Sequence, residues 1–220
     1  MRIAPEGYRE IAGSSAVLAA LSALCWFGFP WGIAGCAVVW IWVISFFRDP
    51  HRSTDYQPDR LYAPADGTVA DITTVASADG FSGSVLRIGI FLSIFNVHIN
   101  RSPMAGTIRS LHYRPGAFLD ARHPQAGERN ESNTLIMEPS GALIGPVVVR
   151  QVAGKIARRI ICHARIGDTL TAGQRFGLIK FGSRTELIVP ADQYVARVEV
   201  GQTVRGGLTV LAQARAEISK

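Results

Sequence analysis

Residues 176–200 read FGLIKFGSRTELIVPADQYVARVEV, and this stretch holds the pattern that decides the fold class. Three short apolar runs, at 176–180, 187–190 and 194–200, are separated by turn-forming Gly, Ser, Pro and Asp residues. Apolar runs of about 4–8 residues between turn signals are typical of β-strands, whereas a helix needs a longer periodic segment. The stretch therefore predicts consecutive strands.

The same pattern extends over residues 61–220, where no segment keeps a helical period. Further strand-like runs lie at 85–94, 135–138, 147–152 and 158–163, and a short helical turn is expected within 92–100. Turns at 63–69 and 166–177 resemble half-motifs of the barrel-sandwich hybrid. The sequence predicts a mainly β domain, a compact barrel or sandwich. It does not predict a lipoyl or biotin carrier, because no Lys lies at a hairpin tip between Met residues.

Residues 15–47 contain no charged side chain and predict a membrane anchor. One spanning helix needs about 20 apolar residues, so the run is too long for one level helix and too short for two full spans. Phe29-Pro30-Trp31-Gly32 divides it, since Pro and Gly favour a break. We expect two short helices, at 16–28 and 32–47, that dip into the membrane. One long tilted helix is the alternative.

Positive residues flank the apolar run on both sides, with Arg2 and Arg9 before it and Arg48 and Arg52 after it. Because positive flanks tend to stay in the cytoplasm, both ends are expected on the cytoplasmic side. A lipobox-like sequence at 33–36 suggests acylation of a cleaved N-terminus instead. It is disfavoured, because ten of the eleven residues that follow it are apolar and a mature lipoprotein normally continues polar.

Composition narrows the class of protein further. Hydrophobic residues make up 48% and charged residues 18% of the chain, which excludes a disordered protein. The net charge of +6 falls entirely within residues 48–220 and, beside a membrane anchor, favours an anionic lipid surface over nucleic acid. The scattered cysteines are neither a disulfide framework nor a zinc site, so no metal is expected. The predicted organisation is an N-terminal segment (1–14), anchor (15–47), linker (48–60) and β domain (61–220).

The sequence Gly182-Ser183 lies between two apolar runs and is an ordinary turn when taken alone. However, glycine permits a strained backbone, which lets the serine hydroxyl approach the preceding carbonyl. That arrangement suits an acyl shift from nitrogen to oxygen at the Gly182–Ser183 bond. Such a hydroxyl needs a base, and the base needs a carboxylate to orient it. His98 and Asp66 are the candidates, although taken alone His98 is more typical of a strand end and Asp66 of a turn.

Five segments in order carry a resemblance to a known family: FFRDPHR at 46–52, LYAPADGTV at 61–69, FLSIFNVHINRSP at 91–103, YRPG with ERNE at 113–131, and FGS at 181–183. Over nearly its whole length the chain resembles the phosphatidylserine decarboxylase family in its short, membrane-anchored bacterial form. Two positions depart from the family pattern. Arg184 follows the serine where Thr is frequent, and Arg101 stands where many members have a second His.

The resemblance implies self-cleavage at Gly182–Ser183 into a β chain (1–182) and an α chain (183–220) that stay associated. It implies that Ser183 becomes a pyruvoyl cofactor, with His98 as base and Asp66 orienting it. The substrate amine then forms a Schiff base with that ketone, and phosphatidylserine becomes phosphatidylethanolamine. Substrate-side candidates are Arg101, Phe118, Asn130 and Glu131. The location implied is the bacterial cytoplasmic membrane, with the catalytic domain on the cytoplasmic side.

Two alternatives remain open at the level of sequence. A membrane-anchored serine hydrolase would use Asp66, His98 and Ser183 without cutting the chain, although no nucleophile-elbow motif is present. A related decarboxylase of archaeal-type ether phospholipids would use the same residues, because acyl chains leave no readable pattern. The oligomeric state is also left open.

Overall fold

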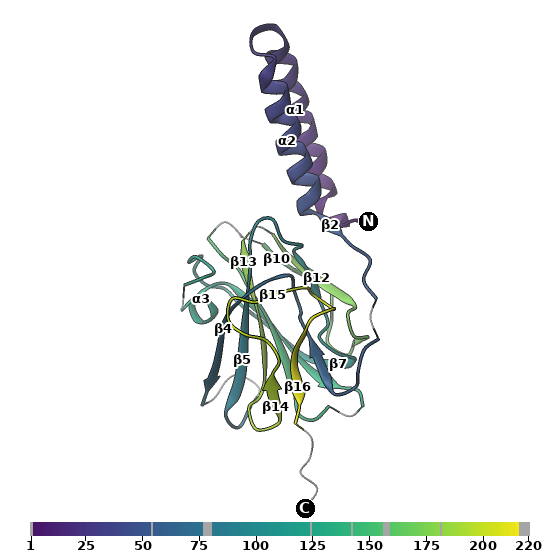
Figure 1. The fold of residues 1–220 in the computed structure, drawn as a ribbon, viewed down its shortest axis with the longest axis vertical. Coiled ribbons are helices and arrows are strands. Elements are labelled where there is room, and N and C mark those ends of the chain that lie inside the picture. Colours follow the sequence, from purple (N-terminus) through teal and green to yellow (C-terminus); the bar gives the residue numbers. More distant parts are fainter. Residues whose placement is uncertain are drawn as a thin grey trace, which may run out of the picture. The chain divides into compact units, whose positions relative to one another are not determined.

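The structure is a computed structural model that describes residues 2–53, 55–76, 81–123, 125–141, 143–155, 159–180 and 182–215. Arg158 and Phe181, which belong to segments used above, lie outside the described residues. The chain divides into two compact units, Met1–His51 and Arg52–Lys220, and each is described by itself (Figure 1).

The first unit is a helical hairpin with a small strand pair at its base. In chain order it contains β1 (Arg2–Ile3), the 3-10 turn η1 (Pro5–Gly7), α1 (Tyr8–Gly28), α2 (Trp31–Phe46) and β2 (Arg48–Asp49). β1 pairs antiparallel with β2. Between the helices, Trp40 Nε1 donates a hydrogen bond to Ser15 Oγ at 2.7 Å. The predicted break is present, because the helices are interrupted at Phe29 and Pro30.

Helix α1 begins at Tyr8, eight residues earlier than the sequence analysis expected. Pro5 opens the preceding turn, where its missing N–H costs nothing, and the chain continues from that turn into the helix. At about 1.5 Å per residue, α1 is about 32 Å long and matches a hydrocarbon core of about 30 Å. Pro5–Gly28 is long and apolar enough to cross a membrane, whereas α2 is shorter.

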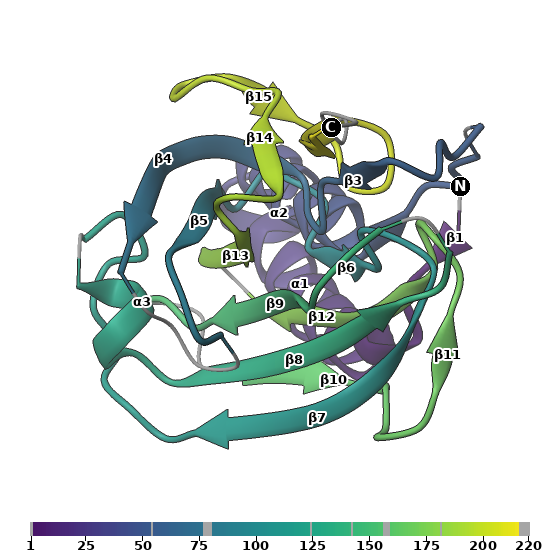
Figure 2. The ribbon, with the colours of Figure 1, turned by 90° about the horizontal axis from the view of Figure 1, so that it is seen from below.

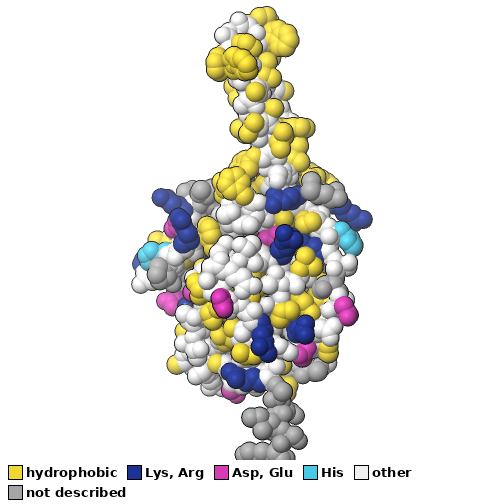
Figure 3. Space-filling view, in the orientation of Figure 1, with side chains coloured by type: hydrophobic (Ala, Val, Ile, Leu, Met, Phe, Trp, Pro, Cys, Tyr) yellow, Lys and Arg dark blue, Asp and Glu magenta, His cyan; other side chains and the backbone are white. Residues whose placement is uncertain are grey.

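Large apolar side chains cover the outside of the hairpin (Figure 3). Phe27 is 91% exposed and Trp31 79% exposed, and both lie near the turn between the helices. Exposed apolar surface of this extent marks a contact with lipid or protein. The first unit therefore fits the predicted anchor.

The second unit consists almost entirely of antiparallel strands. Among the described residues its elements are β3 (Arg60–Tyr62), β4 (Gly67–Val75), β5 (Val85–Leu92), β6 (Ile99–Arg101), β7 (Gly106–Arg114), α3 (Ala126–Arg129), β8 (Ser132–Pro139), β9 (Val147–Val152), β10 (Arg159–Cys162), β11 (Thr169–Leu170), β12 (Arg175–Lys180), β13 (Ser183–Pro190), β14 (Tyr194–Ala196), β15 (Thr203–Val204) and β16 (Val210–Ala214). The predicted mainly β fold is confirmed.

One large sheet has the strand order β11-β7-β8-β9-β13-β5-β4-β15, and it curls into a half-barrel (Figure 2). Two three-stranded sheets, β10-β12-β6 and β14-β16-β3, accompany it. Among the described strands that sequence patterns did not single out, β4 and β7 are the longest, and polar residues interrupt the apolar pattern along both. Within 92–100 the structure has a hydrogen-bonded turn, closed by the Asn96 N–H donating to the Ser93 carbonyl at 2.9 Å, and then strand β6.

Strand β13 lies at the centre of the large sheet, between β9 and β5, and is buried on both faces. Leu187 and Val189 join the main core cluster, whereas Ile188 packs on the opposite face with Val85 and Val148. Because side chains alternate along a strand, Ser183 and Thr185 share the side of Leu187. Arg184 and Glu186 share the side of Ile188.

The opposite face of β13 carries a buried ion cluster of Asp71, Arg150, Arg184 and Glu186. Arg184 Nε donates to Glu186 Oε1 at 2.8 Å, and Arg184 Nη2 donates to Asp71 Oδ1 at 2.8 Å. Arg150 Nη1 donates to the second oxygen of Glu186 at 3.3 Å. Burial alone would lower the pKa of Arg184, but the hydrogen bond from Asp71 and the charges of Glu186 and Asp71 outweigh it and raise this pKa. Arg184 therefore stays charged.

Replacing Arg184 by Met should lower the free energy of unfolding by about 3 kcal/mol, because a buried Glu186 would lose its closest charged partner. The measurement is denaturant unfolding of the detergent-solubilised protein, in a Ser183→Ala background in which the predicted self-cleavage would not occur. Arg109→Met is the control, since the Arg109–Glu138 pair is exposed and should matter little. Equal losses in the two variants would contradict a structural role for the cluster.

Candidate active site

Ser183 is the first residue of β13, and its side chain is fully buried. Its Oγ has no hydrogen-bond partner among the described residues. The residue before it, Gly182, has a φ of +55°, in the left-handed region that disfavours side chains. A buried hydroxyl that is not committed to a structural hydrogen bond is available for chemistry.

His98 lies directly before β6 and is also fully buried. Its Nδ1 lies 3.0 Å from the carbonyl oxygen of Asn96. Since a carbonyl only accepts hydrogen bonds, Nδ1 must carry a proton for this contact to be favourable. In the neutral ring the lone pair then lies on Nε2, which is the form that a general base requires.

Two features bring His98 and Ser183 to the same corner of the β unit. The Ile179 N–H donates to the His98 carbonyl at 3.3 Å, so the backbone of His98 lies beside β12, four residues before Ser183. In addition, Asn100 Nδ2 donates to Thr185 Oγ1 at 3.1 Å. His98 and Asn100 lie on one side of β6, and Ser183 and Thr185 on one side of β13. Together with the hydrogen bond between Ile179 and His98, this contact brings His98 and Ser183 to the same corner.

A chain of buried amides supports this corner. Gln151 Nε2 donates to Asn100 Oδ1 at 2.8 Å, and Asn133 Nδ2 donates to Gln151 Oε1 at 3.0 Å. Buried polar groups of this kind are costly unless paired, and a paired chain sets the spacing of the elements that it joins. Here it holds β6 against β9 and β8.

Asp66 precedes β4 at the same end of the large sheet as Ser183, on the other side of β5. The register pairs Thr68 with Phe91, and Ser183 with Leu92. Both oxygens of Asp66 accept hydrogen bonds, Oδ2 from Arg52 Nη2 at 2.7 Å and Oδ1 from the Gly206 N–H at 2.8 Å. His98 Nδ1 contacts the Asn96 carbonyl, and orientation of His98 by Asp66 stays a prediction.

The loop from 115 to 131 reaches the end of β9 through Asn130. The buried Asn130 side chain donates to the carbonyls of Leu119 and Ala153 at 2.9 and 2.8 Å, so it holds the loop in place. Arg122 lies over the ring of Phe91 at 5.5 Å. Its hydrogen bond to Asp120 lowers the pKa of that carboxyl to about 2.

The remaining substrate-side candidates lie in different surroundings. Phe118 is 36% exposed and Glu131 is partly buried, with a side-chain hydrogen bond to Tyr113. Burial and the neighbouring Glu131 raise the pKa of Tyr113. Arg101 is buried, and its Nη1 donates to the Gly173 carbonyl at 3.1 Å. Contact of these residues with substrate remains a prediction.

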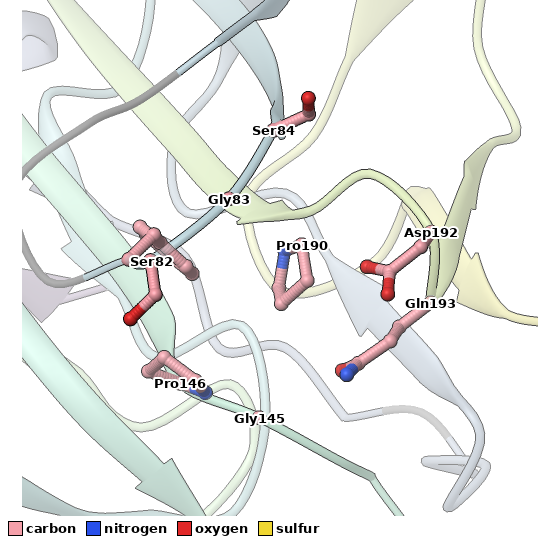
Figure 4. Close-up of a pocket in the computed structure, with 9 residues that line it drawn as sticks. Ser82, Gly83, Ser84, Gly145, Pro146, Pro190, Asp192 and Gln193 are labelled. Atoms are coloured by element: carbon pink, nitrogen blue, oxygen red, sulfur yellow. The ribbon is translucent and has the colours of Figure 1, made fainter.

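A cavity of about 480 Å³ lies elsewhere in the β unit, lined by Ser82, Pro146, Pro190 and Gln193, among others (Figure 4). Pro190 is the last residue of β13 and Ser183 the first. At about 3.3 Å per residue, the two ends of this strand lie about 23 Å apart. This cavity is therefore separate from the serine and histidine.

No group of three or more potential metal ligands occurs among the described residues.

Sequence reasoning missed several residues that shape the corner. Arg52 was considered only as a positive residue that flanks the anchor and as part of the motif at 46–52, yet its side chain pairs with Asp66. Asn96 and Asn100 lie inside the segment 91–103 that resembles the family. Nothing in their spacing indicated that they contact His98, Thr185 and Gln151. These contacts join residues distant in sequence or depend on a local turn, so they require the folded chain.

The fold and this corner define a class of protein, a mainly β protein with a buried serine and a buried histidine at the same corner. Comparison with known proteins identifies the family. The model of the family described as "Phosphatidylserine decarboxylase" matches residues 40–212. A phosphatidylserine decarboxylase proenzyme from Magnetococcus marinus is 40% identical over 222 residues, which cover 99% of this chain and 97% of that protein.

The chain therefore belongs to the phosphatidylserine decarboxylase family. It is an enzyme of phospholipid synthesis that removes the carboxyl group of phosphatidylserine.

Proposed function

We propose that the chain is a precursor that cuts itself between Gly182 and Ser183 and uses the resulting pyruvoyl group as its cofactor. The observation that carries the proposal is Ser183 itself. Its buried hydroxyl has no hydrogen-bond partner among the described residues, and it follows a left-handed glycine. The name of the M. marinus relative, a proenzyme, supports maturation by cleavage.

In the first step Ser183 Oγ attacks the carbonyl carbon of Gly182, and His98 Nε2 takes the hydroxyl proton. The bond between Gly182 and the Ser183 nitrogen breaks, and that nitrogen receives a proton, which leaves an ester and a free amine. Loss of the Ser183 α-proton then expels Gly182 as a carboxylate and leaves dehydroalanine. Water hydrolyses the tautomeric imine to a ketone and ammonia.

In the second reaction the pyruvoyl ketone supplies an electron sink once the amine of the substrate has condensed with it. His98 would return a proton to the carbon that has lost CO₂, and water would then release phosphatidylethanolamine and restore the ketone. Asn96 keeps the proton on Nδ1 of His98, so that Nε2 exchanges protons in both reactions. Asp66, held by Arg52 and Gly206, adds a negative charge at this end of the sheet.

The two chains should remain associated after cleavage. Strand β13 begins at the cut and pairs with β5 over its full length and with β9 over five residues. Its side chains enter the main core and the ion cluster. None of these interactions depends on the Gly182–Ser183 bond.

We also propose that the enzyme works at an anionic membrane that contains phosphatidylserine. The apolar hairpin provides the anchor, and the net charge of +6 favours anionic lipid by about 1 kcal/mol for each well-placed basic residue. Positive residues on both sides of the anchor favour the cytoplasmic side of the cytoplasmic membrane. Protease should therefore reach the β unit in inside-out vesicles and not in right-side-out vesicles.

The proposal is tested by trapping the adduct between substrate and enzyme with a reductant. The experiment uses membranes that have been washed with carbonate and therefore retain only integral proteins. Phosphatidylserine with cyanoborohydride should inactivate the enzyme and add lipid-derived mass to the 38-residue chain that begins at position 183. The reason is that the reductant fixes an amine that has condensed with a ketone.

Phosphatidylglycerol, which lacks an amine, should add no mass, and the uncut Ser183→Ala chain should not be labelled. Added mass on the 182-residue chain would instead indicate a lysine adduct at Lys155 or Lys180. Loss of the protein in the wash would contradict the integral anchor.

A further inference from the structure

Gly154 lies directly opposite Gly182 in the register of the large sheet. Strand β9 pairs with β13 antiparallel, with Val152 opposite Arg184 as the last pair. Two residues further along β9 and two residues back along β13, the same register reaches Gly154 and Gly182. Both lie just beyond the ends of their strands, at the bond that the proposed self-cleavage breaks.

The carbonyl oxygen of Gly182 is packed against the Cα of Gly154. A methyl group built on Gly154 would overlap this oxygen, and the carbonyl carbon of Gly182 would lie only 3.2 Å from it. The separation from the oxygen would be under 3.0 Å, which real Cβ atoms essentially never show, so a side chain at 154 must displace the Gly182 peptide. The oxygen in question belongs to the carbonyl that Ser183 attacks.

Gly154 cannot move away from this contact easily. The preceding residue, Ala153, is fully buried, and its N–H donates to the Glu131 carbonyl at 2.9 Å. The carbonyl of Ala153 accepts a 2.8 Å hydrogen bond from the Asn130 side chain. On the other side, Ala121 of the same loop would lie 3.3 Å from a Cβ on Gly154. The loop from 115 to 131 and β9 therefore hold Gly154 against the scissile carbonyl.

We infer that Gly154 is a positioning residue for self-cleavage, because its missing side chain is what allows the Gly182 carbonyl to face Ser183. The inference rests on the proposed function. In the acyl shift the Ser183 Oγ–Gly182 carbon bond forms while the bond from that carbon to the Ser183 nitrogen breaks. The oxygen packed on Gly154 carries the negative charge in between. A displacement of about 1 Å in such a reaction costs about 100-fold in rate.

The test compares the rate of self-cleavage of wild type and Gly154→Ala, followed by intact mass after synthesis of the precursor. Gly154→Ala should cut at least about 100-fold more slowly. Gly83→Ala is the matched control, because a Cβ there meets nothing within 4 Å and its φ is not positive. It should cut at the wild-type rate.

A second readout separates positioning from general damage. Once the bond is cut, Gly182 is a free carboxylate, so Gly154 no longer constrains a reacting group. The Gly154→Ala molecules that do mature should therefore decarboxylate phosphatidylserine with the wild-type kcat per pyruvoyl group. Thermal unfolding is first measured with and without Gly154→Ala, in the Ser183→Ala background. Self-cleavage of wild type and of Gly154→Ala is then compared at a temperature at which both precursors are folded.

The outcomes are distinct. Slow cleavage with normal turnover per pyruvoyl group supports the inference. Cleavage of Gly154→Ala at the wild-type rate would overturn it, and so would an equal fall in cleavage and in turnover per pyruvoyl group. A wild-type chain that never cuts would instead overturn the proposed function and would leave Gly154 no reaction to position.

Discussion

Ser183→Ala is expected to keep the protein as a single chain of 220 residues and to abolish decarboxylation, whereas the wild type yields chains of 182 and 38 residues. The substitution removes the only atom that attacks Gly182, and with it the source of the ketone. The loss should exceed about 10⁴-fold, as for removal of a nucleophile. Intact mass and product formation measure the two effects.

The substitution should leave the fold unchanged, which makes it a clean test. Ser183 Oγ has no hydrogen-bond partner among the described residues, so its removal leaves no donor or acceptor unpaired among them. Serine and alanine otherwise fill nearly the same space. A fully uncut wild-type chain in an active preparation would exclude a pyruvoyl cofactor and would favour the serine hydrolase alternative.

His98→Ala should slow self-cleavage by about 10²- to 10⁴-fold, the usual contribution of a positioned general base. The Ser183 hydroxyl would have to lose its proton without Nε2 of His98, in a site with little access to water. The measurement is the fraction of uncut precursor against time. Added imidazole should restore part of the rate if His98 acts as a base, and should restore nothing if the ring serves only packing.

His112→Ala provides the control for His98, because His112 lies on β7 with an exposed side chain. It should cut at the wild-type rate. Rapid cleavage of His98→Ala would reassign the base. His163, which directly follows β10, would then be the next residue to replace.

Short strands are the part of the fold that local patterns predicted best. Strand β9 was predicted with its observed bounds, because VVVRQV is a compact apolar run buried on both faces. Strand β13 begins at Ser183, four residues before the predicted run, since Arg184 and Glu186 interrupt the apolar pattern. Their charges are paired inside the protein with each other and with Asp71. A pattern of side-chain polarity does not reveal pairing across strands.

The residues of the candidate site also fall into two groups, those that local sequence patterns predicted and those that they did not. Ser183, His98 and Asp66 were predicted as site residues because each stands in a recognisable segment, and the order of those segments identified the family. Gly154 stood in no such segment. Its importance arises from the register between β9 and β13, which brings together two glycines that are 28 residues apart in the sequence.

The sequence by itself determined the family and the mainly β class, and it predicted the apolar anchor and the reacting serine. These follow from local order, periodicity and composition, which are properties of contiguous residues. Only the tertiary structure decided that Asn96 contacts His98, that Arg52 binds Asp66, and that Gly154 faces the scissile carbonyl. The physical reason is that strand register, turn geometry and close packing bring backbone atoms within a few ångströms, and a linear pattern carries no information at that scale.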